Sequence, residues 1–290
     1  MVQIKPFEKL TLLDDFLFSV AAEDMEFCRR MLQVILGKKI VSIRRRQTQK
    51  EIKTLPELRG IRLDLLIEDD TGAIYNVEVQ IRNIGNLPRR SRFYQGLIDI
   101  PLLIRGEEDF NNINDTYLIV ISPFDLFGAG KYRYTFKNLC LEDPAIHLDD
   151  GATRIFLNTR GTNTADVSPE LIAFLKYAES SSSELTGEDD ESDLAYIKSY
   201  IRKLKSSREI GVTYMQSWEK ERLLRDEGRG EGIIEGTAMS ILTLLKDFGT
   251  IPADLEKIIV SESDMTLLSK WLKIAAKANC LDDFLLKYRN

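Results

Sequence analysis

Two neighbouring segments of alternating apolar and polar residues place the strongest constraint on how this chain folds. Residues 61–67 and 74–81 both alternate, and the sequence between them, Glu68-Asp69-Asp70-Thr71-Gly72, is rich in turn-forming residues. A period of two predicts strands, and a loop this short predicts that the two strands pair as an antiparallel hairpin. Side chains of one parity then face an apolar core, and those of the other parity form a polar face.

The polar face of this hairpin gathers acidic and amide side chains. Asp64 lies opposite or diagonal to Glu78 in the expected register, and Gln80 shares their face. Two carboxylates held this close repel each other unless a cation sits between them. Mg²⁺ suits the pair because it accepts one or two protein carboxylates and keeps waters that a phosphate oxygen can replace. From spacing alone, a metal site for phosphodiester hydrolysis and an ordinary solvent-facing acidic hairpin both remain open.

The rest of the sequence predicts a mixed α/β sheet flanked by helices. Residues 8–36 have apolar positions at helical spacing, read as one or two helices, and stop at Gly37, which can cap a helix. The other expected elements are a short strand at 40–47, a helix at 89–103 that Pro101 bends or ends, strands at 116–122, 132–136 and 153–157, and a helix at 169–178.

Composition changes along the chain predict three regions. Residues 1–180 carry the α/β pattern, and a polar, acidic, serine-rich stretch follows directly. Residues 181–236 combine this linker with a charged segment interrupted by glycines, which reads as a glycine-weakened helix or a flexible hinge. Residues 237–290 form a small helical region of two or three amphipathic helices, with one apolar stripe around Ile241 and Leu245 and another around Leu268 and Trp271.

Composition and charge exclude several classes of protein. No apolar run approaches the ~18–20 residues that cross a bilayer, and the N-terminal residues lack the apolar core of a signal peptide, so we expect a cytoplasmic protein that does not enter membranes. A single histidine excludes metal sites built on several histidines. The net charge of −6 gives no global attraction for nucleic acid, but residues 43–50 and 88–92 are locally basic and can bind a polyanion.

Four stretches in a fixed order carry a family resemblance. They are Arg62-Leu63-Asp64 with Ile74-Tyr75-Asn76-Val77-Glu78-Val79-Gln80, then residues 87–99, then 124–128 with 132–136, and finally 149–151 with 155–159. Over roughly residues 10–235 the chain resembles PD-(D/E)XK nucleases, and among them the recombination-promoting nuclease/putative transposase family. The resemblance implies a restriction-endonuclease-like mixed sheet flanked by helices, with a helical C-terminal extension.

The resemblance also implies roles for the hairpin residues. Asp64 and Glu78 become metal ligands, and the carbonyl of Val79 becomes a third protein contact, for Mg²⁺ with Mn²⁺ as a substitute. Gln80 stands where the wider superfamily usually has a lysine, and a glutamine offers neutral hydrogen bonds instead of a positive charge. Arg82, two residues on and on the same face, is our candidate for that charge, although a solvated strand-end arginine is an equal alternative.

Further residues follow from the same resemblance. Asp15 on the first helix matches an auxiliary acidic residue, although it can equally be a helix cap, and Glu23 is a weaker choice. The helix after the hairpin is expected to contact the DNA backbone through Arg90, Arg92, Tyr94 and Gln95. Tyr94 also fits a packing role.

Two functions from different classes follow. The first is a Mg²⁺-dependent endonuclease that cuts double-stranded DNA by attack of a metal-activated water. The second is a catalytically weak or inactive nuclease-fold protein that acts by binding DNA or partner proteins, which the glutamine at position 80, the acidic net charge and the helical extension favour. The sequence leaves open the DNA sequence preference, the biological role and the oligomeric state, a homo-oligomer included.

Overall fold

The structure is a computed structural model that describes residues 4–52, 61–102, 109–180 and 192–288. The chain divides into two compact units, Met1–Gly211 and Val212–Asn290. The acidic, serine-rich linker expected after residue 180 lies almost entirely outside the described residues. The division into three regions therefore stays a prediction.

The first unit is built on one mixed sheet of six strands in the order β1-β2-β3-β4-β6-β5. The first three strands pair antiparallel, β3, β4 and β6 run parallel, and β5 returns antiparallel along β6. The strands are β1 (Ile43–Ile52), β2 (Ile61–Asp69), β3 (Ile74–Val79), β4 (Thr116–Ser122), β5 (Arg133–Phe136) and β6 (Ala152–Asn158). This confirms the expected fold class, with a mixed sheet and flanking helices.

The strands differ in composition according to their place in the sheet. β4 is almost wholly apolar and nearly all of its residues are buried, as expected of a central parallel strand. β1 is rich in charge and pairs only with β2, which makes it an edge strand. It is longer than the strand expected at 40–47, because its pairing with β2 and not an apolar pattern sets its length.

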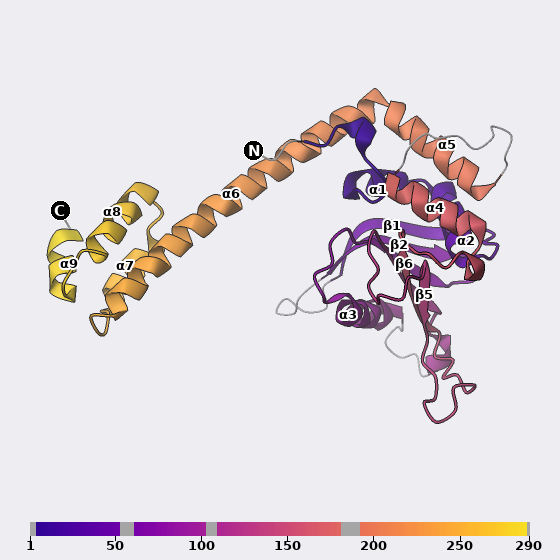
Figure 1. Ribbon diagram of the computed structural model, residues 1–290, viewed down its shortest axis with the longest axis horizontal. Helices are drawn as coiled ribbons and strands as arrows, with labels where there is room; N and C mark the ends of the chain where they lie inside the picture. The colour runs from indigo at the N-terminus through magenta and orange to yellow at the C-terminus, as the bar shows by residue number, and fades with distance from the viewer. Residues whose placement is uncertain (1–3, 53–60, 103–108, 181–191, 289–290) are drawn as a thin grey trace. The chain divides into compact units, whose positions relative to one another are not determined.

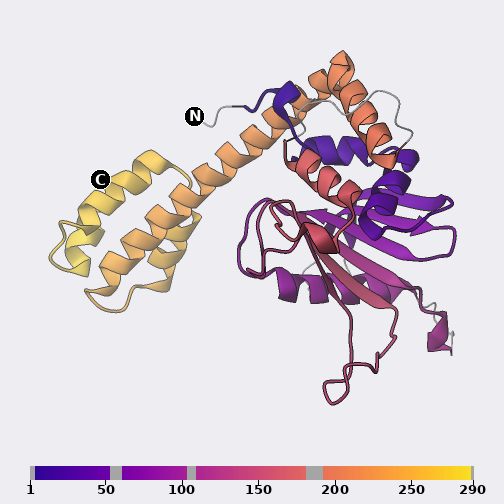
Figure 2. The same ribbon diagram turned by 45° about the vertical axis from the view of Figure 1, so that its right-hand side comes forward.

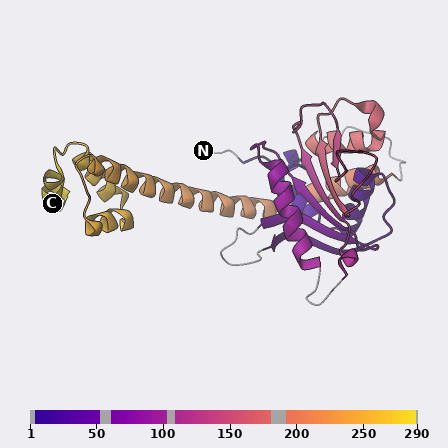
Figure 3. The ribbon, with the colours of Figure 1, turned by 90° about the horizontal axis from the view of Figure 1, so that it is seen from below.

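Helices cover both faces of the sheet (Figure 1). They are α1 (Asp15–Ala21), α2 (Met25–Leu36), α3 (Leu87–Asp99), α4 (Pro169–Ser180) and α5 (Asp193–Ser206). α1, α2 and α4 lie on one face and α3 lies alone on the other, as a second view also shows (Figure 2). Seen from below, α3 lies in front of the strands (Figure 3). The face that α3 covers is thus the less crowded one.

α2 ends where the sequence predicted. Gly37 has φ +66°, and its N–H donates to the carbonyl of Gln33. A glycine adopts this left-handed conformation without the strain that a Cβ would add, so the prediction of a glycine cap is confirmed.

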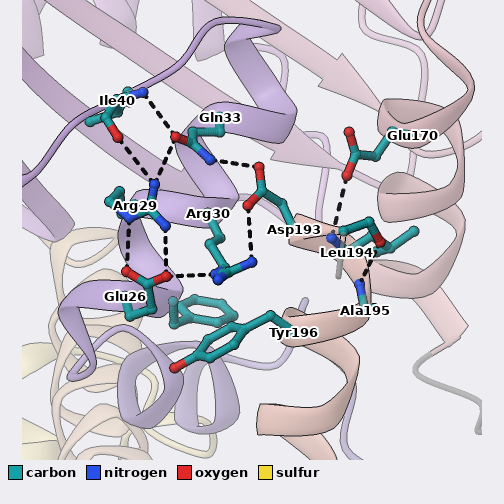
Figure 4. A network of polar contacts seen from close by, with 12 residues as sticks. Glu26, Arg29, Arg30, Gln33, Ile40, Glu170, Asp193, Leu194, Ala195 and Tyr196 are labelled. Atoms are coloured by element: carbon teal, nitrogen blue, oxygen red, sulfur yellow. Dashed lines mark hydrogen bonds and ion pairs between the residues drawn. The ribbon is translucent and has the colours of Figure 1, made fainter. Parts of the chain in front are cut away.

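A network of charged and polar side chains fastens α5 to α2 (Figure 4). The Glu26 carboxylate accepts hydrogen bonds from Arg29 at 2.6 and 2.8 Å and from Arg30 at 2.6 Å. Arg30 and Gln33 in turn donate to Asp193, in the first turn of α5, at 3.3 and 2.6 Å. The hydrogen bonds from Arg29, with the weaker effect of Arg30, lower the pKa of Glu26 to about 2. Every charge in this cluster has an opposite charge beside it.

The second unit is helical and has its own core. It contains most of α6 (Arg208–Lys246), with α7 (Ala253–Ser261), α8 (Met265–Ala275) and α9 (Leu281–Tyr288). The stripes around Ile241 and Leu245 and around Leu268 and Trp271 are buried in one cluster. The glycine-interrupted segment lies within α6, in agreement with the helical alternative. None of the helices in the described part of the chain is long and apolar enough to span a membrane.

Candidate active site

The hairpin of β2 and β3 brings the two predicted carboxylates together. Leu65 pairs with Val77, and continuing that register by one residue places Asp64 opposite Glu78. The backbone N–H of Asp64 donates to Glu78 Oε1 at 3.2 Å, and the N–H of Val79 donates to Asp64 Oδ2 at 3.0 Å. Each side chain therefore reaches the backbone of the opposite strand, which fixes both carboxylates at the same level of the sheet.

The residues that alternate with this acidic pair are apolar and buried. Leu65 and Val77 are wholly inaccessible to solvent, and Ile67 and Tyr75 are almost so. β3 ends at Val79, two residues earlier than expected, and Ile81 beyond it is 55% exposed. The apolar face predicted for the hairpin thus ends with the strand.

Both carboxyl groups are costly to ionise in the folded protein. Burial, and then the charge of Asp64, raise the pKa of Glu78, which is only 5% exposed. Burial also raises the pKa of Asp64, with a further contribution from the negative charge of Asp15. Buried Glu78 and half-buried Asp64, whose pKa values are raised in part by neighbouring negative charges, form a donor set that a hard divalent cation stabilises. The residues present therefore fit a bound Mg²⁺ or Mn²⁺.

Gln80 is held in place from three sides. Its backbone N–H continues the pairing with β4 by donating to the carbonyl of Ile121 at 2.9 Å. Its side-chain Nε2 donates to the backbone carbonyl of Arg82 at 2.7 Å, and its Oε1 accepts from Arg90 Nη2 at 2.5 Å. Both functional groups of the amide are therefore engaged.

Arg90 places a positive charge at this site from α3. Its guanidinium lowers the pKa of both Asp64 and Glu78 and so opposes the effect of burial, which raises them. From the sequence, we expected Arg82 to supply the positive charge that a lysine supplies in the wider superfamily. We expected Arg90 to contact the DNA backbone. Arg82 is exposed and contacts Gln80 through its carbonyl, so a catalytic role for its side chain stays a prediction. No local pattern points to Arg90, because only the packing of α3 on the sheet brings it to Gln80.

Asn76 is a second neighbour that sequence reasoning missed. It lies two residues before Glu78 on β3, so both side chains point to the same face. Asn76 is completely buried, and neither of its amide atoms completes a hydrogen bond within the described part of the chain. Its amide nevertheless acts to lower the pKa of Glu78. The signal in the sequence was that Asn76 lies two residues before Glu78 and therefore shares its face of the strand.

The auxiliary acid lies near the pair without joining it. Asp15 is the first residue of α1 and is exposed, and the N-cap position belongs to Asp14. The negative charge of Asp15 contributes to the raised pKa of Asp64. In the described ranges, no three histidine, cysteine or acidic side chains converge as a ready metal site. Glu23 is exposed between α1 and α2. The auxiliary role of Asp15 stays a prediction.

The other α3 residues divide between surface and interior. Arg92 is exposed, while Tyr94 is half-buried with the Arg90 guanidinium 5.5 Å from its ring centre. Gln95 is buried, and its Nε2 donates to Thr116 of β4. The expectation that Gln95 contacts DNA is wrong, because its amide joins α3 to the sheet. DNA contacts by Arg92 and Tyr94 stay predictions.

Comparison with known proteins gives one match. The profile of a family described as PD-(D/E)XK nuclease family transposase matches residues 16–222, which is more than half of the chain and includes the whole hairpin and α3. No curated protein matches, and no solved structure matches.

Proposed function

The chain belongs to the PD-(D/E)XK nuclease family transposases, and from this premise we propose that it is a Mg²⁺-dependent endonuclease that cuts double-stranded DNA. Family membership supports a nuclease-like function. The finer proposal is carried by the facing pair of half-buried Asp64 and buried Glu78, whose pKa values are both raised. A site that keeps two carboxylates under mutual repulsion is built for a positively charged ligand.

The metal would be held by three oxygen donors of the hairpin. They are the carboxylates of Asp64 and Glu78 and the backbone carbonyl of Val79, and such hard donors suit Mg²⁺, with Mn²⁺ as a substitute. When bound, the ion supplies a water of lowered pKa and neutralises charge that develops on the phosphate. Asp15 adds negative charge nearby and so increases the attraction of the site for a cation.

Arg90 and Gln80 would supply what the lysine supplies in the wider superfamily. A guanidinium can donate to two phosphate oxygens at once, and its charge does not depend on pH. The hydrogen bond to Gln80 Oε1 holds Arg90 toward the acidic pair. We assign Gln80 a positioning role through Arg90, and keep Arg92 and Tyr94 as contacts to the DNA strand.

A second function is favoured by one observation. Gln80 is neutral, and both ends of its amide already form a hydrogen bond within the protein, so it supplies no positive charge to an attacking hydroxide or to the phosphate. A nuclease-fold protein of this kind could bind DNA or protein partners with little or no cutting.

Plasmid nicking separates these functions. Supercoiled plasmid is incubated with the full chain in Mg²⁺ or Mn²⁺, and wild type is compared with Asp64→Ala and Glu78→Ala. Asp166→Ala serves as the matched control, since Asp166 is an exposed acidic residue outside the site. We expect metal-dependent cutting by wild type and by the control, and none by the two site variants.

Calorimetric titration with Mn²⁺ completes the test. Wild type that binds Mn²⁺ without cutting, with binding lost in Asp64→Ala, would favour the second function. Variants that cut as well as wild type would remove the hairpin from the active site altogether.

A further inference from the structure

A small basic cavity lies at the edge strand of the sheet, beside the acidic hairpin. Its volume is about 120 Å³. Its polar lining comes from β1 and β2, and the segment at the end of α3 closes it with apolar side chains. The residues that matter here are Arg45, Gln47 and Lys50 of β1, with Leu66 and Glu68 of β2 and Leu102.

The pairing of β1 with β2 locates this cavity relative to the acidic pair. Lys50 pairs with Leu63, the residue directly before Asp64. Gln47 pairs with Leu66, which lies two residues after Asp64 and on the same side of the strand. At ~3.3 Å per residue, Leu66 is roughly 7 Å from Asp64 along β2. Adjacent phosphates of one DNA strand are about 7 Å apart, because the backbone winds around the helix axis as it advances by 3.4 Å per nucleotide, so this distance corresponds to about one nucleotide.

Two cationic side chains, Arg45 and Lys50, line the cavity. Burial, and then the charge of Arg45, lower the pKa of Lys50. Glu68 lies opposite Arg45 in the ladder. Within the described ranges, however, neither Arg45 nor Lys50 forms an ion pair. An anion bound between them would relieve their repulsion.

A third polar group faces the same space. Gln47 Oε1 is buried and has no hydrogen-bond donor among the described residues. A half-turn of the amide exchanges Oε1 for Nε2, so Gln47 can offer a donor where its oxygen now lies unsatisfied. The polar lining therefore carries two cations, one carboxylate (Glu68) and one amide donor, and its net positive charge suits a phosphate group.

We propose that Arg45 and Lys50 bind a backbone phosphate of the DNA strand, about one nucleotide from the bond that is cut. The inference rests on the proposed function, since it gives that function a second anchor for its substrate. The acidic pair alone cannot hold DNA, because its charge repels phosphate until a cation is present. A basic cavity on the same side of the hairpin would bind the DNA backbone. It would thereby fix which phosphate of the DNA strand lies at the acidic pair.

The test is fluorescence anisotropy with a short labelled DNA duplex and the full chain. Ca²⁺ replaces Mg²⁺, and a gel confirms that the duplex stays intact. Lys50→Gln and Arg45→Gln are each expected to raise the Kd by about fivefold and to reduce the slope of log Kd against log salt by about one. Arg44→Gln is the matched control, because Arg44 is an exposed arginine on the same strand that does not line the cavity.

Charge-preserving replacement separates binding from structure. Lys50→Arg is expected to keep the Kd within about twofold of wild type, and thermal melting followed by circular dichroism should show that all variants fold. The inference is overturned if Arg44→Gln weakens binding as much as Lys50→Gln, if the salt slope is unchanged, or if Lys50→Arg binds as poorly as Lys50→Gln. Failure of the proposed function would show separately, as wild type that does not cut, and would leave these binding measurements intact.

Discussion

Two glutamates of the first unit, Glu26 and Glu78, show opposite uses of the same side chain. Glu26 on α2 accepts hydrogen bonds from two guanidiniums, and the pKa of its carboxyl group is lowered to about 2. Glu78 on β3 is buried opposite another carboxylate, and burial with that neighbour raises its pKa. One glutamate is stabilised by the folded protein, and the other is destabilised by it.

The two glutamates show how a charge that stabilises the fold differs from a charge that is kept for a ligand. In the network around Glu26, opposite charges meet and each adds modestly to the attachment of α5. In the hairpin, the folded state accepts a penalty that only a ligand can remove. Sites where burial and like charges shift pKa values strongly are candidates for function, whereas a network of paired charges has a sufficient explanation in packing.

The largest effect is expected from Glu78→Gln, which should change activity and stability in opposite directions. Loss of a metal ligand removes several kcal/mol of transition-state stabilisation, so cutting should fall by roughly a thousandfold. The pKa of Glu78 is raised above its ordinary value of 4.5, so at neutral pH the folded protein must either ionise this group at a cost or take up a proton, and both lower its stability. Without metal, the variant should therefore gain about 1–3 kcal/mol in free energy of unfolding.

Urea denaturation of wild type and of Glu78→Gln, with a chelator and at several pH values, measures the predicted gain in free energy of unfolding. A group whose pKa is raised by folding costs no stability at pH values below its pKa in the unfolded chain, because it is then protonated in both states. The stability gained by Glu78→Gln should therefore vanish as the pH falls through about 4. An unchanged or lowered stability of the variant at neutral pH would contradict the comparison. Asp166→Asn, at an exposed site, controls for the loss of one negative charge.

Arg90→Gln should have the next largest effect. Removing the guanidinium raises the pKa of both carboxyls further, so the variant should need a higher pH to reach half of its maximal cutting rate. A supporting residue of this kind typically contributes about 10–100-fold. Rates measured over a Mg²⁺ titration at two pH values test this, with the exposed Arg92→Gln as the control.

The double variant Gln80→Lys with Arg90→Gln sharpens that result. If Arg90 carries the charge that a lysine would carry, the new lysine should recover much of the loss caused by Arg90→Gln. Gln80→Lys alone should gain less than about threefold, because it places two cations where one suffices. A large gain in the single variant would instead show that the glutamine limits catalysis.

The smallest effect is expected from Glu26→Gln. It should lower the free energy of unfolding by about 1 kcal/mol, since the partly exposed carboxylate is screened, and leave cutting unchanged. The pKa of Glu26 is lowered in the folded protein, so its contribution is present above about pH 4.5 and is lost as the pH falls toward 2. The difference between variant and wild type should shrink over that range in thermal melts followed by circular dichroism. Loss of cutting would mean that the network serves the site after all.

Sequence reasoning reached the parts of the molecule that depend on local patterns. Alternation located both strands of the hairpin and the meeting of Asp64 with Glu78, and helical spacing located the cap at Gly37 and the core around Trp271. It failed where position depends on packing between distant segments. Arg90 reaches Gln80 only because α3 docks on the sheet, and β1 is longer than expected because its partner strand and not its own composition extends it.

The contact between Arg90 and Gln80 also implies a pattern of inheritance. If the charge at the site comes from α3 and the amide on β3 only holds it, the two positions form one unit that selection acts on jointly. Relatives with a lysine at position 80 should then be free to lose the arginine at position 90, and relatives that keep glutamine should retain it. An alignment of the family checks this, and independent variation at the two positions would contradict it.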